Sequence, residues 1–123
     1  MFESSADEWR NWELIAEARD RRSQDSSPSC SDLVRAARAT SLHRLFPFFS
    51  MNSLCFSTLP EALGLVAPAF VVMSREGEYV IWRGDPKGGE HVRALSTREA
   101  VVAAEKVEFL LDGWPASSDD SGQ

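Results

Sequence analysis

Cysteine and histidine are scarce in this sequence, with two of each among 123 residues. Cys30, His43, Cys55 and His91 show none of the short spacings of a zinc site, so we predict no bound metal. The N-terminal residues contain no apolar run typical of a secretion signal. Together these features indicate reduced thiols and a cytoplasmic location.

A long apolar stretch is also missing. The longest one, Leu63 to Met73, is interrupted by Gly64 and Pro68 and is too short to cross a bilayer. Acidic residues outnumber basic ones by 19 to 13, which gives a net charge of −6 and a pI of about 4.9. We therefore expect neither a nucleic acid nor a membrane as a partner.

Signatures of cofactor binding and of catalysis are absent as well. The segment Gly84 to Gly89 contains glycines and a lysine, but it matches neither a P-loop nor a dinucleotide-binding fingerprint. No nucleophile elbow, serine triad or paired-carboxylate motif is present. We predict no cofactor, and only His91 and His43 remain as candidates for acid–base chemistry, with Arg93 or Arg44 as anion binder.

What the sequence does contain is typical of one folded domain. Hydrophobic residues make up 43% and charged residues 26%. A chain of this length encloses a core without metals or disulfides. The apolar periodicity, capping residues and turn signals predict these elements: helices over Asp7–Arg22, Asp32–Phe46 and Thr97–Asp112, and strands over Ser53–Ser57, Ala69–Ser74, Glu78–Arg83 and Glu90–Leu95.

The predicted fold is α+β. A four-stranded, mostly antiparallel sheet packs on the C-terminal helix, and two N-terminal helices precede it. Residues 1–22 are expected to form a tethered helix that carries Trp9 and Trp12, and residues 23–31 a Ser-rich flexible linker. Residues 32–115 form the α+β domain, and residues 116–123 a polar tail.

The pairing of the last two strands decides which side chains share a face of the sheet. We expect Trp82 to lie opposite His91. One face, which packs on the C-terminal helix, then consists of Tyr79, Ile81, Val92 and Ala94. The other face consists of Val80, Trp82, His91 and Arg93. It either lines a ligand-binding cleft, with Arg93 as a cation–π partner of Trp82, or is covered by the second helix.

A phenylalanine-rich segment, Arg44 to Ser50, connects the second helix to the first predicted strand. Its phenylalanines and proline would be costly to expose to water. One interpretation is a buried corner between helix and strand. The other is a small-molecule site in which Arg44, Ser50 and Ser57 are polar groups in an aromatic wall.

The residues around this corner follow a recognisable order: Leu45-Phe46-Pro47-Phe48, Ser50, Leu54, Phe56 and Ser57. This order resembles the signature of a family of small actinobacterial proteins, which are labelled natural-product biosynthesis proteins without an assigned reaction. The similarity extends to Thr97–Ala100, while Phe49 and Met51 depart from the family pattern. The resemblance implies a role in specialised metabolism but no particular chemistry.

The C-terminal helix carries a second apolar stripe, Val102 and Phe109, on the side away from its core-facing residues. Either the tethered helix, folded back, or a second molecule in a homodimer would cover this stripe. We predict that Trp9 or Trp12 contacts Phe109, within the chain or across the dimer.

Three hypotheses about function remain. The first is an accessory or interaction protein of specialised metabolism, which binds a partner protein or a small-molecule pathway intermediate. The second is a small cofactor-free cyclase, isomerase or lyase, and the third is an immunity or antitoxin protein. A deep pocket containing a histidine would favour the enzyme, whereas a flat apolar patch would favour the binding protein.

Overall fold

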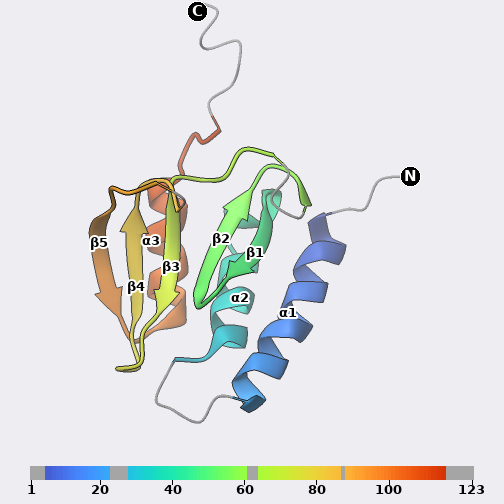
Figure 1. Ribbon diagram of the computed structural model, residues 1–123. Helices are drawn as coiled ribbons and strands as arrows, with labels where there is room; N and C mark the ends of the chain where they lie inside the picture. Colours follow the sequence, from blue (N-terminus) through green and yellow to red (C-terminus); the bar gives the residue numbers. More distant parts are fainter. Residues whose placement is uncertain (1–4, 23–27, 61–63, 87, 116–123) are drawn as a thin grey trace, which may run out of the picture.

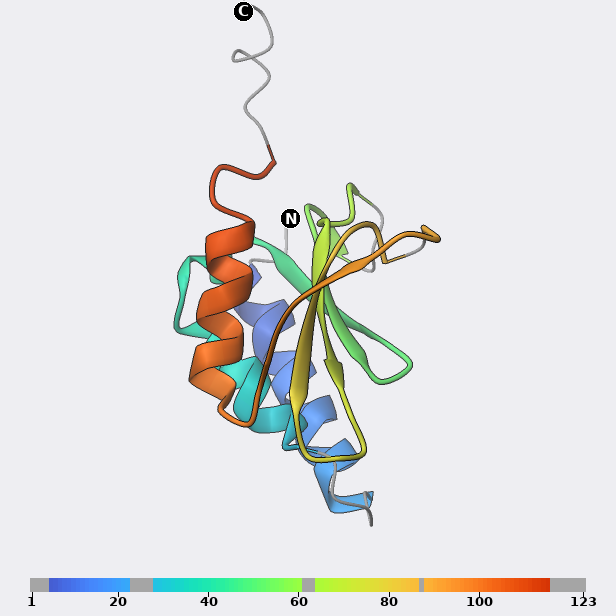
Figure 2. The ribbon, with the colours of Figure 1, turned by 90° about the vertical axis from the view of Figure 1, so that its left-hand side faces the viewer.

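The computed structural model describes residues 5–22, 28–60, 64–86 and 88–115. Within these residues, helices cover one face of an antiparallel sheet and leave the other face open (Figures 1 and 2). The part of the predicted linker at 23–27 and the predicted tail at 116–123 lie outside the described residues. The helices are α1 (Ser5–Arg22), α2 (Cys30–Arg38) and α3 (Ala100–Leu110), with a short 3₁₀ helix, η1 (Ser41–Arg44).

The sheet has five strands in the order β1-β2-β3-β4-β5, and every neighbouring pair is antiparallel. Its strands are β1 (Phe46–Ser50), β2 (Ser53–Ser57), β3 (Ala69–Met73), β4 (Tyr79–Arg83) and β5 (Val92–Thr97). The α+β class is confirmed, but the expectation of four strands is wrong, because the segment after the second helix pairs with β2 as a fifth strand.

The second helix is shorter than the sequence indicates. Ser29 caps the start of α2, where its hydroxyl accepts a hydrogen bond from the backbone N–H of Asp32. The helix ends at Arg38, and the hydroxyl of Thr40 then caps η1. Pro47 lies in β1, an edge strand of the sheet, where a missing N–H is tolerated.

Helix α1 belongs to the hydrophobic core. The Trp9 side chain is fully buried, and its Nε1 donates a hydrogen bond of 2.8 Å to the carbonyl oxygen of Leu45. On the outer side, Arg35 of α2 forms ion pairs with Glu13 and Glu17 of α1 at 2.8 and 2.6 Å. In the structure α1 is therefore packed on the domain, and Trp9 is part of the domain's core.

The register between β4 and β5 differs from the prediction. Tyr79 and Ile81 do join the core that contains Val107 and Leu111 of the C-terminal helical segment, as expected. However, Ile81 pairs with Leu95 and Trp82 with Arg93, because a β-bulge leaves Ala94 as an extra residue in β5. Val92 pairs with Arg83 at the end of β4 and is 62% exposed.

None of the helices in the described part of the chain is long and apolar enough to cross a membrane.

Candidate functional site

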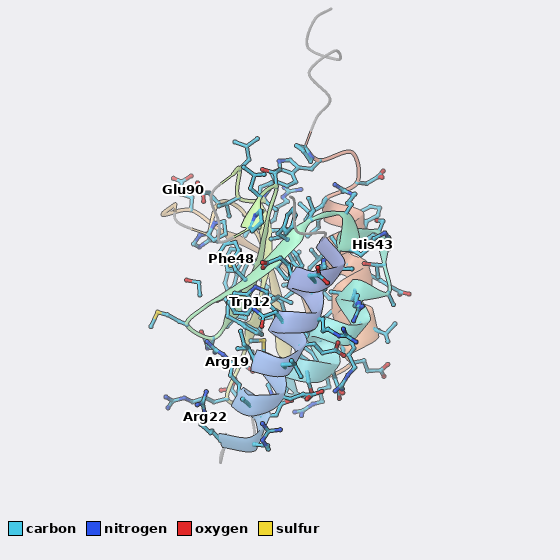
Figure 3. The ribbon with its side chains drawn as sticks, turned by 90° about the vertical axis from the view of Figure 1, so that its right-hand side faces the viewer. Trp12, Arg19, Arg22, His43, Phe48 and Glu90 are labelled. Atoms are coloured by element: carbon cyan, nitrogen blue, oxygen red, sulfur yellow. The ribbon has the colours of Figure 1, made fainter. Side chains whose placement is uncertain are left out.

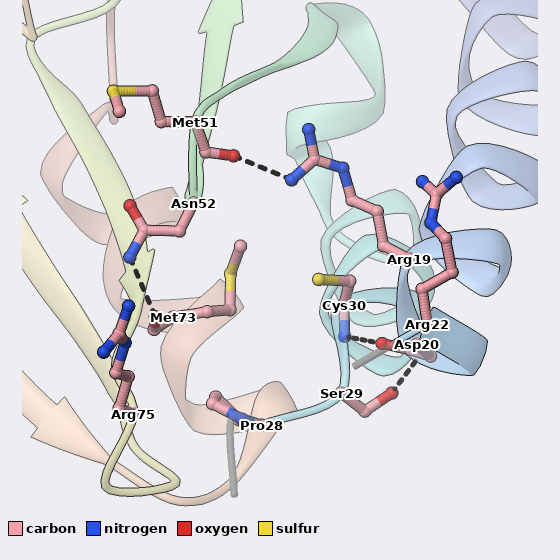
Figure 4. A pocket seen from close by; sticks show the side chains of 10 residues that line it. All are labelled: Arg19, Asp20, Arg22, Pro28, Ser29, Cys30, Met51, Asn52, Met73 and Arg75. Atoms are coloured by element: carbon pink, nitrogen blue, oxygen red, sulfur yellow. Dashed lines mark hydrogen bonds between the residues drawn. The ribbon is translucent and has the colours of Figure 1, made fainter. Parts of the chain in front are cut away.

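A cleft of about 810 Å³ opens at one end of the molecule, between the end of α1 and the tips of two hairpins (Figure 4). This volume lies within the range of small-molecule pockets. The cleft is lined by residues from four parts of the chain: Arg19, Asp20, Arg22, Pro28, Ser29, Cys30, Met51, Asn52, Met73 and Arg75. We call it the arginine cleft.

Positive charge gathers in the arginine cleft although the whole chain carries a net charge of −6. Arg19 and Arg22 come from the last turn of α1, and Arg75 follows β3 on the facing wall (Figure 4). The guanidinium of Arg19 lies 4.5 Å from the centre of the Phe49 ring and donates a hydrogen bond of 2.7 Å to the Met51 carbonyl oxygen. Its position is therefore fixed from two sides.

The carboxylate of Asp20 is the acidic group in the cleft, and it is already fully engaged. It accepts hydrogen bonds from the backbone N–H groups of Cys30 and Ser31, at 2.7 and 3.0 Å, and from the hydroxyls of Ser29 and Ser31. Partial burial alone would raise the pKa of Asp20, but these hydrogen bonds outweigh it and hold the pKa below its usual value. Asp20 thus stays ionised, and its charge stabilises the N-terminus of α2.

The thiol of Cys30 is a wall of the cleft and not a reactive group. Burial and the nearby Asp20 carboxylate raise its pKa to about 11. The thiol is consequently protonated at neutral pH, and a protonated thiol is neither a nucleophile nor a metal ligand. Among the described residues, no group of three or more His, Cys, Asp and Glu side chains is placed to hold a metal ion.

Met51 forms the rim of the cleft in an unfavourable backbone conformation. Its φ of 56° lies in the left-handed region, which costs a residue with a Cβ more than it costs glycine. The side chain is 86% exposed. The hydrogen bond from Arg19 and one of 3.1 Å from Asn52 Nδ2 to the Met73 carbonyl oxygen hold this turn. The conformation follows from the hairpin, because Ser50 pairs with Ser53 and a two-residue hairpin turn needs a positive φ at its first residue.

The Met51→Gly variant is expected to be more stable than the wild type, by about 0.5 kcal/mol. Glycine removes the cost of the left-handed conformation, and this gain exceeds the added chain entropy of the unfolded state. Urea denaturation followed by circular dichroism measures the difference. Met51→Ala is the matched control, because alanine shortens the side chain but keeps the strain. A Met51→Gly variant less stable than Met51→Ala would contradict this account.

The predicted cluster of Trp82, His91 and Arg93 does form, on the open face of the sheet. The His91 ring lies 6.2 Å from Trp82 and 5.2 Å from Phe70, and the Arg93 guanidinium lies 6.0 Å from the centre of the Trp82 ring. Val80 shares this face, since it alternates with Ile81 along β4. The alternative that α2 covers this face is wrong, because the helices lie on the other side (Figure 2).

Neither candidate acid–base histidine lines the arginine cleft. His91 Nε2 is 2.8 Å from the backbone oxygen of Asp85, and His43 Nδ1 is 2.7 Å from that of Thr40. His43 lies in η1, away from Arg19 and Arg22 (Figure 3). The arginine cleft and a second cleft between α2 and α3 are both lined without histidine.

The polar groups of the phenylalanine-rich corner do not form one site. Arg44 donates hydrogen bonds to the carbonyl oxygens of Leu111 and Trp114 and so binds the end of α3. Ser57 is buried and donates to the Leu59 carbonyl oxygen at 2.6 Å. Ser50 lies at the opposite end of the β1–β2 hairpin, paired with Ser53. These contacts keep Arg44, Ser50 and Ser57 apart, and the segment itself is the edge strand β1, in which Pro47 is buried and the phenylalanines are half-buried.

The predicted contact of Trp9 or Trp12 with Phe109 is wrong within the chain. The Trp9 ring lies 6.1 Å from Phe56, and the Trp12 ring lies 5.5 Å from Phe49. Phe109 and Val102 lie on the outer side of α3, where Phe109 is 72% exposed. The contact across a dimer stays a prediction for Trp12, while the burial of Trp9 removes it from such an interface.

Fold and cleft together define a small α+β protein with an arginine-lined cleft and without a catalytic histidine or thiolate in that cleft. A family model matches residues 6–110, and the chain belongs to this family, DUF6193, a family of unknown function. No curated protein and no solved structure matches the chain. The arginine cleft therefore has to be interpreted from its own chemistry.

Proposed function

We propose that this protein is an accessory protein of natural-product biosynthesis, which binds an acidic pathway intermediate in the arginine cleft. The observation that carries the proposal is that Arg19, Arg22 and Arg75 all line one cleft of an acidic protein. Planar guanidinium groups bind carboxylate and phosphate groups through paired hydrogen bonds. The natural-product context comes from the sequence resemblance around β1 and β2.

Binding, and not catalysis, is the role that the remaining groups support. Asp20 has its oxygens occupied by four hydrogen bonds, and Cys30 keeps its proton at neutral pH. General acid–base catalysis needs a group that titrates near the working pH, and neither of these does. What the cleft offers a ligand is hydrogen-bond donors.

The walls between the arginines favour a ligand that also has an apolar part. Met51 and Met73 supply flexible thioether side chains, and Pro28 supplies a rigid apolar surface. A ligand with one or two acidic groups on an apolar body would match both kinds of wall. Inorganic anions are expected to bind more weakly, because they leave the apolar walls unused.

No feature of the described residues supports the other two hypotheses as the arginine cleft supports ligand binding. These are the hypothesis of a cyclase, isomerase or lyase and the hypothesis of an immunity protein. The open face with Trp82, His91 and Arg93 would suit a partner protein, since it combines rings with a cation. We place the partner-protein alternative there.

The test is calorimetric or NMR titration of the whole chain with a panel of acidic probes: inorganic phosphate, pyrophosphate, citrate and 4-hydroxybenzoate. Arg22→Gln is expected to weaken binding about tenfold, the size of one charged hydrogen bond. Arg22 is exposed, so the variant should fold normally.

Arg21→Gln is the matched control for this test. Arg21 is the neighbouring residue in α1, its replacement makes the same change in net charge, and it does not line the cleft. The affinity of this variant should equal that of the wild type. Equal losses in both variants, or no binding of any probe, would overturn the proposal.

A further inference from the structure

The outer side of α3 presents apolar side chains to water. Val101, Val102 and Phe109 are 59%, 38% and 72% exposed, whereas Ala103, Ala104 and Val107 on the other side belong to the core. A helix with apolar residues on two sides is normally covered on both. We call Val101, Val102 and Phe109 the outer face of α3.

Helix α1 does not cover the outer face of α3. Trp9 is fully buried on Phe56 and Leu45, and Trp12 lies against Phe49. Within the described residues, the Phe109 ring is contacted by the Lys106 side chain, whose Nζ lies 5.2 Å from the ring centre. Among the described residues this face therefore stays exposed to solvent, where a second molecule can reach it.

The charges beside the outer face are arranged so that it can pair with itself. Each residue of an α-helix turns by about 100°, so Val102 and Phe109, seven positions apart, form one line along the axis. Glu105 then lies roughly 50° to one side of this line, and Lys106 roughly 50° to the other. One acidic and one basic side chain thus flank the same apolar line.

We propose that the outer face of α3 binds a second copy of this chain, with the two α3 helices parallel and related by a two-fold axis along them. This symmetry places Glu105 beside Lys106 of the partner subunit, and Lys106 beside Glu105 of the partner subunit. Phe109 packs on Phe109 of the partner subunit, and Val102 packs on Val102 of the partner subunit.

An antiparallel pair has the opposite electrostatics. Its two-fold axis is perpendicular to the helices, so it brings Glu105 beside Glu105 of the partner subunit and Lys106 beside Lys106 of the partner subunit. Like charges at such short distance disfavour that arrangement. In the parallel pair, both the apolar contacts and the pairing of opposite charges favour association.

The face is small, so the dimer is a reversible one. Stable interfaces bury about 800 Å² on each partner, more than one face of an eleven-residue helix provides. We expect dissociation constants between about 10 µM and 1 mM. High salt should weaken the dimer, because the charged pairs are exposed.

Sedimentation equilibrium of the full chain, over about this concentration range, tests the proposal. The wild type should change from the mass of one chain to that of two. Glu105→Lys makes both flanks of the apolar line basic, and Lys106→Glu makes both flanks acidic. Each single variant should weaken association about tenfold. Glu76→Lys, an exposed change of the same charge in the turn before β4, is the control and should not.

An equimolar mixture of the two single variants is the decisive sample. In a mixed pair, each lysine beside the apolar line of one chain faces a glutamate of the other, so the mixture should associate at least as well as the wild type. Both positions are on the helix surface, and equal melting temperatures would confirm that the variants fold. A wild type that stays monomeric throughout, or a mixture that associates no better than its components, would overturn the proposal.

Discussion

The Val107→Asp variant is expected not to fold. Val107 is fully buried in the core that contains Tyr79 and Ile81 of β4. An ionised carboxylate there has no partner, and burying it costs more than about 4 kcal/mol. Together with the lost packing of the valine side chain, this cost is comparable with the about 5–15 kcal/mol by which domains of this size are stable, so we expect the folded population to be small. Far-UV circular dichroism at neutral pH measures the loss of helix.

Val101→Asp is the control for this experiment. It makes the same chemical change on the same helix, at a side chain that is 59% exposed. It should keep the wild-type spectrum and nearly the wild-type melting temperature. If Val107→Asp also melted like the wild type, α3 would not pack on the sheet through this side.

The second large effect is expected for Trp9→Ala, at the other end of the sequence. This change empties a fully buried site and leaves the Leu45 carbonyl oxygen without its hydrogen-bond donor. Truncating a buried tryptophan costs about 3–5 kcal/mol, and the lost hydrogen bond adds to that. Urea denaturation should show a midpoint far below that of the wild type.

Trp12→Ala serves as the comparison in the same helix. Trp12 is only partly buried and contacts Phe49 at the surface of the domain, so about 1–2 kcal/mol is expected. Trp9→Phe keeps most of the apolar volume and isolates the hydrogen bond. Equal, small losses for Trp9→Ala and Trp12→Ala would mean that α1 is a detachable arm after all.

Sequence patterns are sufficient where neighbouring residues decide the structure. Periodicity places α1 and α3 to within a few residues. The patterns fail at β1, because Pro47 suggests the end of a helix equally well as an edge strand. The residue before a proline avoids the helical region in both cases.

The bulge in β5 is not predictable from alternation alone. A strict period of two leads from Trp82 opposite His91 to Ile81 opposite Val92, but Ala94 is inserted, so Trp82 pairs with Arg93 and Ile81 with Leu95. Trp82, His91 and Arg93 nevertheless lie together, because Trp82 pairs with Arg93 and His91 follows the adjoining turn.

The arginine cleft cannot be predicted from sequence patterns, because the residues that line it are distant from one another in the sequence. Arg19 and Arg22 fit the C-terminal end of a helix dipole, which is true of basic residues in any such helix. The sequence around Arg75 predicts only a turn. Only the packing of α1 beside the hairpin tips brings these side chains to one cleft, and no local pattern encodes that packing.

The central claim is that an acidic ligand occupies the arginine cleft, and the arginine side chains themselves report on it most directly. In ¹⁵N-labelled protein, the Nε–Hε signals of Arg19, Arg22 and Arg75 can be followed while an acidic probe is added. We expect these three signals to shift together and to saturate, while the Arg93 signal and the Trp82 indole signal stay in place. Shifts centred on Trp82 and Arg93, with none at Arg22, would contradict the claim and place the ligand on the open face of the sheet.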